Sequence, residues 1–115
     1  MKISIKNYEF DVEVMVSPKD IQKGMMGRVF TPHFNGMLFI MNESEHCFWM
    51  KNCVIPLDII FIKNDVIQKI HHNCQPCIKK DCNNYCGYGE LVLELPGNDC
   101  KIKNINEGDK ITFIH

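Results

Sequence analysis

The stretch Phe48-Trp49-Met50-Lys51-Asn52-Cys53-Val54-Ile55-Pro56-Leu57-Asp58-Ile59-Ile60-Phe61-Ile62 contains a tryptophan, a lysine, an asparagine and an aspartate in an otherwise apolar run. Its second half predicts a strand, on which Asp58 shares a face with Ile60 and Ile62 because side chains alternate at period two. A carboxylate on an apolar face needs a cationic or multi-donor partner. The stretch therefore predicts a strand beside a polar cluster.

The candidate partners of Asp58 are Lys51, Arg28 and Asn52, which offer two cations and an amide donor. Arg28 is the single arginine, beside twelve lysines. It therefore lies either at a site that needs the planar guanidinium group or at an ordinary charged position on the surface. This preference for lysine over arginine is typical of an A/T-rich coding genome, such as that of a virus or phage. A buried ion pair can also do no more than order the fold, and both interpretations stay open.

Alternation of apolar and polar residues predicts strands in the rest of the chain. Tyr8 to Val14 alternates without a fault, and Ile3 and Ile5 before it indicate an opening hairpin. Asn64-Asp65 has the residues of a hairpin turn. Further strands are predicted at residues 36–41, 47–50, 57–63, 66–70, 90–95 and 110–114, with a polar loop at 42–45 and a cysteine-rich loop at 71–89.

One helix is predicted near residues 18–26. Ser17 is a favourable N-cap, Pro18 stands at the first helical position, and Gly24 and Gly27 end the helix early. The fold class expected from these patterns is mainly β, a barrel or sandwich of about seven or eight short strands with one short helix. The whole chain, residues 1–115, is expected to form one domain.

Composition and charge narrow the possible partners. A formal net charge of −1 gives no electrostatic footprint for nucleic acid or an anionic membrane. The sequence contains neither a run of about 18 apolar residues nor the pattern of a signal peptide. We therefore expect a cytoplasmic protein that binds neither nucleic acid nor membrane.

Four of the seven cysteines lie close together, at Cys74, Cys77, Cys82 and Cys86. Thiolates at this spacing can hold one tetrahedral ion, so one structural zinc is a candidate cofactor. One or two disulfides, or free thiols, are the alternatives. Cys47 follows His46, but neighbours on a strand point to opposite faces, so a buried and inert Cys47 is expected.

A pocket is predicted beside the polar cluster. Trp49 and flexible methionines, Met37 among them, would form its apolar wall. Its polar contacts would come from Arg28, Lys51, Asn52 and Asp58. Because arginine binds carboxylate or phosphate through two parallel hydrogen bonds, the expected ligand is small and anionic or rich in hydroxyl groups.

Several segments together resemble a known family. The similar blocks are Gly24-Met25-Met26-Gly27-Arg28, Gly36-Met37-Leu38-Phe39, Phe48-Trp49-Met50-Lys51-Asn52 with Ile55-Pro56-Leu57-Asp58, Pro76-Cys77, Cys82 to Tyr85, Val92-Leu93-Glu94-Leu95 and Gly108-Asp109. In order and spacing, from about Val14 to Phe113, the chain resembles the domain of unknown function 192 family. The resemblance implies a β-rich fold and signature polar residues at Arg28, Lys51, Asn52 and Asp58, and it implies no established reaction.

The chain departs from the family pattern at three cysteines. A threonine usual after the Lys-Asn pair is Cys53 here, and Cys74 and Cys86 are additions to the family's two-cysteine loop.

Three functions follow from these observations. The leading hypothesis is a small accessory or binding domain that uses the polar cluster and the Trp/Met-lined pocket. The first alternative is a zinc-binding or redox module built on the cysteine loop. The second is a small hydrolase-like enzyme with Lys51 or Asp58 as acid or base, although the sequence carries no recognisable catalytic signature.

Overall fold

The structure, a computed structural model, describes all residues from 1 to 115 and contains seven strands and two short helices. In chain order the elements are β1 (Lys2–Ile5), β2 (Tyr8–Met15), α1 (Pro18–Lys23), β3 (Gly36–Trp49), β4 (Leu57–Lys63), β5 (Val66–Cys74), β6 (Asn84–Pro96), α2 (Asp99–Ile102) and β7 (Ile111–Ile114). The mainly β fold class predicted from the sequence is confirmed.

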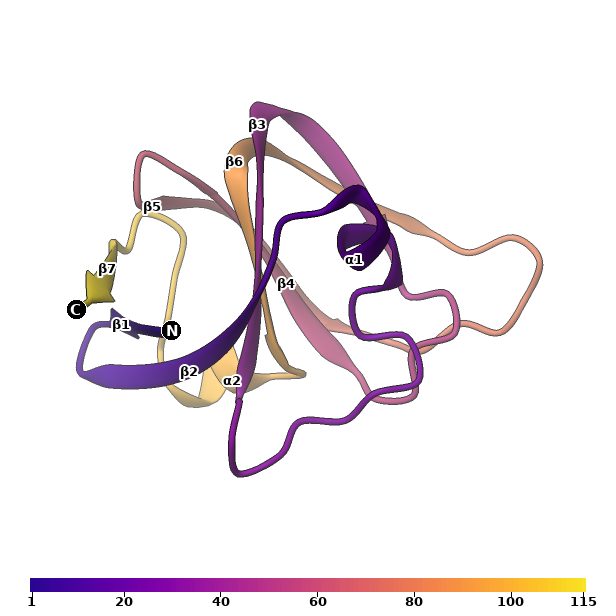
Figure 1. The fold of residues 1–115 in the computed structure, drawn as a ribbon, viewed down its shortest axis with the longest axis horizontal. Helices are drawn as coiled ribbons and strands as arrows, with labels where there is room; N and C mark the ends of the chain where they lie inside the picture. Colours follow the sequence, from indigo (N-terminus) through magenta and orange to yellow (C-terminus); the bar gives the residue numbers. More distant parts are fainter.

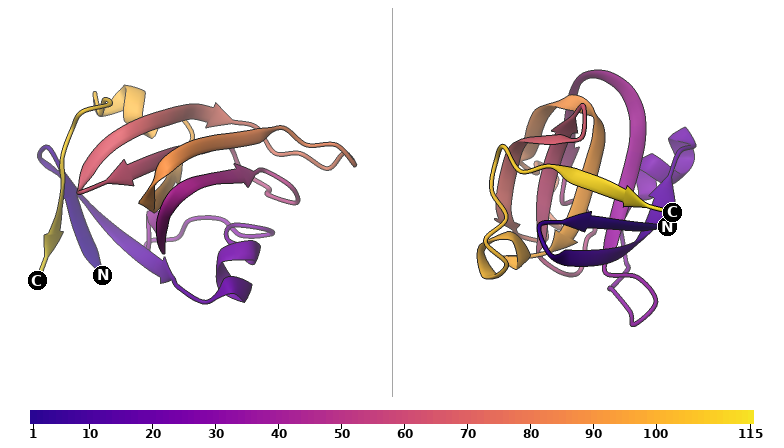
Figure 2. Two further views of the ribbon diagram at one scale, coloured as in Figure 1. Left: turned by 90° about the horizontal axis from the view of Figure 1, so that it is seen from above. Right: turned by 90° about the vertical axis from the view of Figure 1, so that its left-hand side faces the viewer.

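All seven strands belong to one curled sheet in the order β5-β4-β6-β3-β2-β1-β7 (Figures 1 and 2). Neighbouring strands run antiparallel, except that β2 and β3 are parallel. The two edges approach each other at one end, where the amide of Ile67 donates to the carbonyl of Asp109 at 2.8 Å and the amide of Ile111 donates to the carbonyl of Asp65 at 2.7 Å. The sheet is thus a half-barrel that is closed at this end only.

The central strand β4 is buried on both faces because a separate apolar cluster covers each side of the sheet. Ile60 and Ile62 of β4 belong to a cluster of 15 buried residues inside the curl. Ile59 and Phe61 belong to a second cluster of 11 residues, which lies under α1 and the neighbouring loops. This second cluster carries the candidate site described below.

The predicted turns and the helix cap are confirmed. Asn64 and Asp65 both have positive φ angles, 52° and 63°, as a two-residue type I′ hairpin requires. The hydroxyl of Ser17 accepts a hydrogen bond from the amide of Asp20 at 3.2 Å, which caps α1. α1 ends after Lys23, where Gly24 takes a φ of 46°.

Two predictions about the elements are wrong, and one element was not predicted. Residues 42–45 are not a loop, because β3 runs unbroken from Gly36 to Trp49 with an irregularity between Ile40 and Ser44. The cysteine-rich loop is shorter than expected, since β5 extends to Cys74 and β6 begins at Asn84. The second helix, α2, was not predicted; it is only four residues long and carries no clear periodicity.

The distal halves of β3 and β6 form an extension of the sheet beyond the central strands, and the loop between β5 and β6 protrudes at its end (Figure 1). Both chain termini lie at the opposite end of the molecule. Neither helix has the length or apolar character needed to cross a membrane.

Candidate functional site

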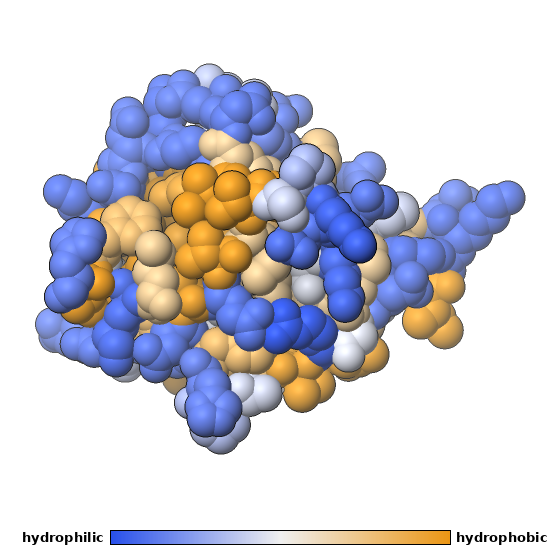
Figure 3. Space-filling view, in the orientation of Figure 1, coloured by the Kyte–Doolittle hydropathy of each residue, from blue (hydrophilic) through white to orange (hydrophobic).

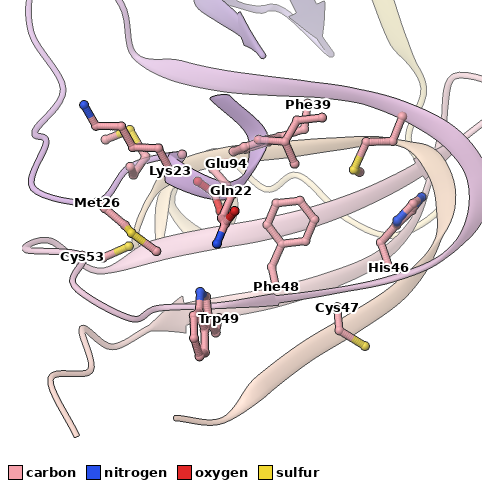
Figure 4. A pocket seen from close by; sticks show the side chains of 14 residues that line it. Gln22, Lys23, Met26, Phe39, His46, Cys47, Phe48, Trp49, Cys53 and Glu94 are labelled. Carbon is pink, nitrogen blue, oxygen red and sulfur yellow. The ribbon is translucent and has the colours of Figure 1, made fainter. Parts of the chain in front are cut away.

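A cavity of about 350 Å³ lies between α1 and the distal half of β3. Nine of the 14 residues that line it are hydrophobic, which makes it a mainly apolar pocket. Figure 4 shows the pocket, and Figure 3 shows hydrophilic residues over α1 with an apolar area beside them on the same face. The lining residues are Ile21, Gln22, Lys23, Gly24, Met25, Met26, Phe39, Met41, His46, Cys47, Phe48, Trp49, Cys53 and Glu94.

Glu94 is the buried carboxyl group of this pocket. It comes from β6, where it lies opposite Met37 of β3 and Ile59 of β4, and the residue is only 4% exposed. Burial raises the pKa of Glu94 from 4.5 to about 8, and no cation or hydrogen-bond donor of the protein offsets this effect. Glu94 is therefore mainly protonated and neutral at pH 7.

Aromatic side chains of β3 line the same pocket as this carboxyl group. Phe39 and Phe48 pack edge to face with ring centroids 5.0 Å apart, and Phe48 packs against Phe61 at 6.1 Å. Trp49 is 44% exposed at the margin of the pocket. In the view of Figure 4 the side chains of Phe48 and Glu94 lie near the middle and Trp49 lies towards one side. A planar or aliphatic group can enter here and bury apolar surface.

Two free thiols, those of Cys53 and Cys74, lie close enough to Glu94 for its carboxylate to raise their pKa values. The pKa of Cys53 is raised to about 11, first by burial and then by Glu94. The pKa of Cys74 is raised to about 12, first by burial and then by Asp58 and Glu94. Both thiols stay protonated at neutral pH, so neither has the thiolate character of a nucleophile or a metal ligand.

Asp58 is placed on the predicted face of β4 but away from the pocket. It is fully buried on the side of Ile60 and Ile62. Its Oδ1 accepts hydrogen bonds from the amides of Asn73 at 2.8 Å and Asn98 at 2.9 Å, and its Oδ2 accepts one from the amide of Cys100 at 2.9 Å. The predicted partnership of this carboxylate with Lys51, Arg28 or the Asn52 side chain is wrong, because backbone amides donate these three hydrogen bonds.

Arg28 forms the bidentate contact that a planar guanidinium group allows, and its partner is the carboxylate of Glu13. Its two terminal nitrogens donate to the two carboxylate oxygens of Glu13, both at 2.8 Å. The guanidinium carbon also lies 4.8 Å from the centre of the Phe34 ring. These hydrogen bonds lower the pKa of Glu13 and raise that of Arg28. Arg28 therefore ties the loop after α1 to β2 and does not line the pocket.

Lys51 and Asn52 hold three loops together. The ammonium group of Lys51 donates to the carbonyl of Lys79. The amide of Asn52 donates to the carbonyl of Cys77 at 3.0 Å, and the carbonyl of Asn52 accepts from the amide of Gly27 at 3.0 Å. Asn52 has a φ of 60°, a left-handed conformation that asparagine adopts more readily than most residues.

The predicted polar cluster is thus not assembled. Asp58, Arg28 and the Lys51-Asn52 pair each make separate contacts within the fold. Of the six residues predicted to bind a ligand, only Trp49 lines the pocket. Met37 is fully buried in the second apolar cluster, beside Glu94 in the sheet.

The four-cysteine zinc site is also not assembled. Cys86 forms a disulfide with Cys47 on β3, and Cys77 forms a disulfide with Cys82 within the loop. Cys74 is a buried free thiol. No group of three or more metal-ligating side chains exists in the structure. The disulfide alternative is the one that the structure supports.

The expectation of a buried, inert Cys47 is wrong as well. Cys47 is exposed on β3, lies directly opposite Cys86 on β6, and lines the pocket. The two residues are 39 positions apart in the sequence, so only the pairing of the two long strands reveals them as partners.

Sequence reasoning did not single out Glu94 as a site residue. Residues 90–95 alternate, and Glu94 stands on the face that such a pattern assigns to solvent. Two signals pointed to it: an acid between Leu93 and Leu95 in an apolar strand, and its place in the Val92–Leu95 block of the family resemblance.

Comparisons with known proteins agree with this fold. A family model described as "Uncharacterized ACR", the domain of unknown function 192, matches residues 1–113. A crystal structure of a protein of unknown function from Novosphingobium aromaticivorans is 30% identical over 97% of this chain and 84% of its own, with a TM-score of 0.86. A crystal structure of a putative transcription regulator from Sinorhizobium meliloti is 28% identical over 96% of this chain and 91% of its own, with a TM-score of 0.85. No curated protein matches the chain.

Proposed function

The chain belongs to the domain of unknown function 192 family, and from this premise we propose that it is a small-molecule-binding domain whose site is the pocket between α1 and β3. The observation that carries the proposal is the unpartnered carboxyl group of Glu94, buried in a mainly apolar cavity of about 350 Å³. Apolar cavities of about 300 to 1,000 Å³ with a few convergent polar groups are typical of ligand sites.

Burial of Glu94 costs folding free energy that the protein itself does not recover. A buried polar group without a hydrogen bond destabilises a fold by about 1–3 kcal/mol. Asp58, on the strand next to it, shows that the same sheet can satisfy a buried carboxylate completely. A ligand that contacts Glu94 would recover this free energy, which supports a binding role for the pocket.

The pocket favours a ligand with an apolar body and one polar group. Phe39, Phe48 and Trp49 offer apolar surface, and Glu94 offers one polar contact away from solvent. The donors on which the sequence-based expectation of an anionic ligand rested are engaged elsewhere, since Arg28 contacts Glu13. A hydroxyl group on the ligand remains suitable, because a carboxyl group accepts or donates a hydrogen bond.

The contacts of the other polar residues do not favour an enzyme. Lys51 and Asp58, the acid or base of the hydrolase alternative, bind backbone groups of the fold. The Sinorhizobium structure is called a putative transcription regulator, but the net charge of −1 gives no overall electrostatic attraction for nucleic acid. We therefore extend the proposal to neither activity.

The disulfides bear on the compartment in which the domain works. Cys47–Cys86 and Cys77–Cys82 would persist in an oxidising compartment and would be kept as thiols in most cytosols. We therefore propose an oxidising compartment instead of the cytoplasm expected from the sequence.

The test is an amide NMR titration of the oxidised protein with apolar fragments that each carry one amine, alcohol or carboxylate. The indole N–H of Trp49, the single tryptophan, gives a reporter in the pocket. We expect shifts confined to α1, the distal half of β3 and Trp49. Phe48→Ala should weaken binding about tenfold or more, because it removes buried apolar surface.

Phe30→Ala is the matched control, since Phe30 is a half-buried phenylalanine that packs on Phe34 and lies outside the pocket lining. It should leave fragment affinity unchanged. Fragments that bind Phe48→Ala as well as the wild type, or that shift residues all over the surface, would show that the pocket is not the site.

A further inference from the structure

We infer that the pocket recognises a cation, and that its ligand is a small amphipathic amine whose protonated nitrogen pairs with Glu94 while its apolar part packs on Phe48 and Trp49. This inference rests on the proposed function and adds the charge and chemical class of the ligand.

The carboxyl group of Glu94 has no positively charged partner within the protein. The six ion pairs of the structure do not include it. Strands on both sides present Met37 and Ile59 at its level in the sheet, so neither neighbour offers a donor. A carboxyl group enclosed in this way can gain a partner only from the cavity, and a cation is the partner that stabilises its charged form most.

Three aromatic side chains, Phe39, Phe48 and Trp49, line the cavity together with Glu94. Phe39 and Phe48 meet edge to face at 5.0 Å, and Trp49 is partly open to solvent at the margin. Aromatic faces attract ammonium groups, and tryptophan attracts them more strongly than tyrosine or phenylalanine does. A carboxylate together with aromatic rings is a chemical environment that favours a cation over an anion or a neutral group of the same size.

The charged and titratable groups that surround Glu94 do not replace the ligand. Lys23 lines the pocket from α1 but forms no ion pair with Glu94, and His46 lines it from β3 with its Nε2 2.7 Å from the carbonyl oxygen of Asn42. Cys53, after β3, and Cys74, on β5, are buried thiols that remain neutral below about pH 10. On β4 the titratable side chain is Asp58, which faces the other side of the sheet.

Binding of an amine must then release a proton. Free Glu94 is mainly protonated at pH 7, so the balanced step is Glu–COOH + R–NH3⁺ → Glu–COO⁻·R–NH3⁺ + H⁺, with the proton passing to solvent. The affinity should rise as the pH rises towards about 8, the pKa of free Glu94, by up to about tenfold per pH unit. It should stay level above that and fall only when the amine itself deprotonates, near pH 10.

The experiment uses three probes of nearly the same shape: phenethylamine, phenethyl alcohol and phenylacetate. Each is titrated into the oxidised full chain at pH 6, 7 and 8 by calorimetry in two buffers of different ionisation enthalpy, with NMR to locate the probe. We expect the amine to bind at least about tenfold more tightly than the alcohol at pH 8. Near pH 6.5 its binding should release close to one proton.

Two variants separate the charge from the shape of the site. Glu94→Gln keeps the volume and removes the charge, so amine affinity should fall to that of the alcohol and the proton release should disappear. Its fold is checked by its NMR spectrum. Glu45→Gln makes the same change at an exposed acid of β3 outside the pocket lining and should leave the pH profile as it is.

The possible failures are distinguishable. Equal affinities for the amine and the alcohol, unchanged by Glu94→Gln, would overturn the inference and leave the binding domain standing. Tighter binding of phenylacetate as the pH falls would overturn it in favour of the anionic ligand expected from the sequence. Binding of none of the three probes at millimolar concentration would overturn the inference and the proposed function together.

Discussion

Asp58 and Glu94 are acidic residues that lie on adjacent strands of one sheet, one register step apart and on opposite faces. Asp58 pairs with Leu95, and Ile59 pairs with Glu94. Asp58 accepts three backbone hydrogen bonds, whereas nothing but burial acts on the pKa of Glu94. β4, whose Asp58 was predicted to lie at a functional site, contributes a structural carboxylate, and the neighbouring strand β6 provides Glu94, the acid that faces the cavity.

Asp58→Ala should be strongly destabilising. It would leave three amides without an acceptor, including that of Cys100 at the start of α2. Because a hydrogen bond to a charged group contributes about 1.5–3 kcal/mol, the free energy of unfolding should fall by more than about 3 kcal/mol. Urea unfolding monitored by circular dichroism measures this.

Asp81→Asn, at an exposed acid of the cysteine loop, is the control and should change stability by less than about 0.5 kcal/mol. A loss after Asp58→Ala no larger than that of the control would mean that these hydrogen bonds do not hold α2 against the sheet.

The two disulfides should differ in their effect on stability. Cys47 and Cys86 are 39 residues apart, whereas Cys77 and Cys82 are 5 apart. From the entropy of loop closure, the double substitution to serine should cost about 4 kcal/mol for the first pair and about 2 kcal/mol for the second. Urea unfolding of the two double variants tests the order, and a greater loss for the short loop would contradict it.

The structure predicts three free thiols per chain. Cys53, Cys74 and Cys100 are free and buried. Three thiols per chain should therefore react with a thiol reagent after unfolding without reductant, and very few before unfolding. A count near seven in a carefully oxidised sample would show that the disulfides do not form.

Arg28→Lys should have a small effect on stability and none on fragment binding. Lysine loses the second hydrogen bond to Glu13 and the packing on Phe34. Both side chains of the ion pair are about one-third exposed, so solvent screens the interaction and the loss should be about 1 kcal/mol. Stability is measured by urea unfolding and affinity by NMR titration. A large loss of affinity with little loss of stability would restore the predicted role of Arg28 in the pocket.

Local features of the fold were predictable from the sequence because they depend on neighbours in the chain. The Asn64-Asp65 hairpin follows from two residues that tolerate positive φ, and the start of α1 follows from a serine cap. The face of Asp58 follows from the alternation of a single strand. Each of these requires knowledge of only a few consecutive residues.

The partners across the sheet were not predictable in the same way. Cys47 meets Cys86 only because β3 continues through a polar segment that looks like a loop. Glu94 is buried only because α1 and the loop that carries Cys53 cover its face of the sheet. Both facts depend on contacts between segments far apart in the chain, and a single strand pattern contains no information about what covers it.

Stability should fall with rising pH because of Glu94, and Glu94→Gln should remove this dependence. The pKa of Glu94 is about 8 in the folded protein and near 4.5 without burial, so between these values the folded state holds a proton that the unfolded chain has lost. The stabilisation is complete below about pH 4.5, declines as the pH rises and is gone above about pH 8. At about 1.4 kcal/mol per pH unit, this carboxyl group removes roughly 3–5 kcal/mol across the interval.

The measurement is the free energy of unfolding in urea at pH 5, 6.5 and 8 for the wild type and Glu94→Gln. The difference between the two should change in favour of the variant as the pH rises, because the amide never ionises. Glu45→Gln, at an exposed acid of β3, is the matched control and should follow the wild type. Parallel curves for the wild type and Glu94→Gln would mean that solvent reaches Glu94 freely. Water would then already solvate the charged carboxylate, and a cationic ligand would pair with it no more strongly than with an exposed surface acid.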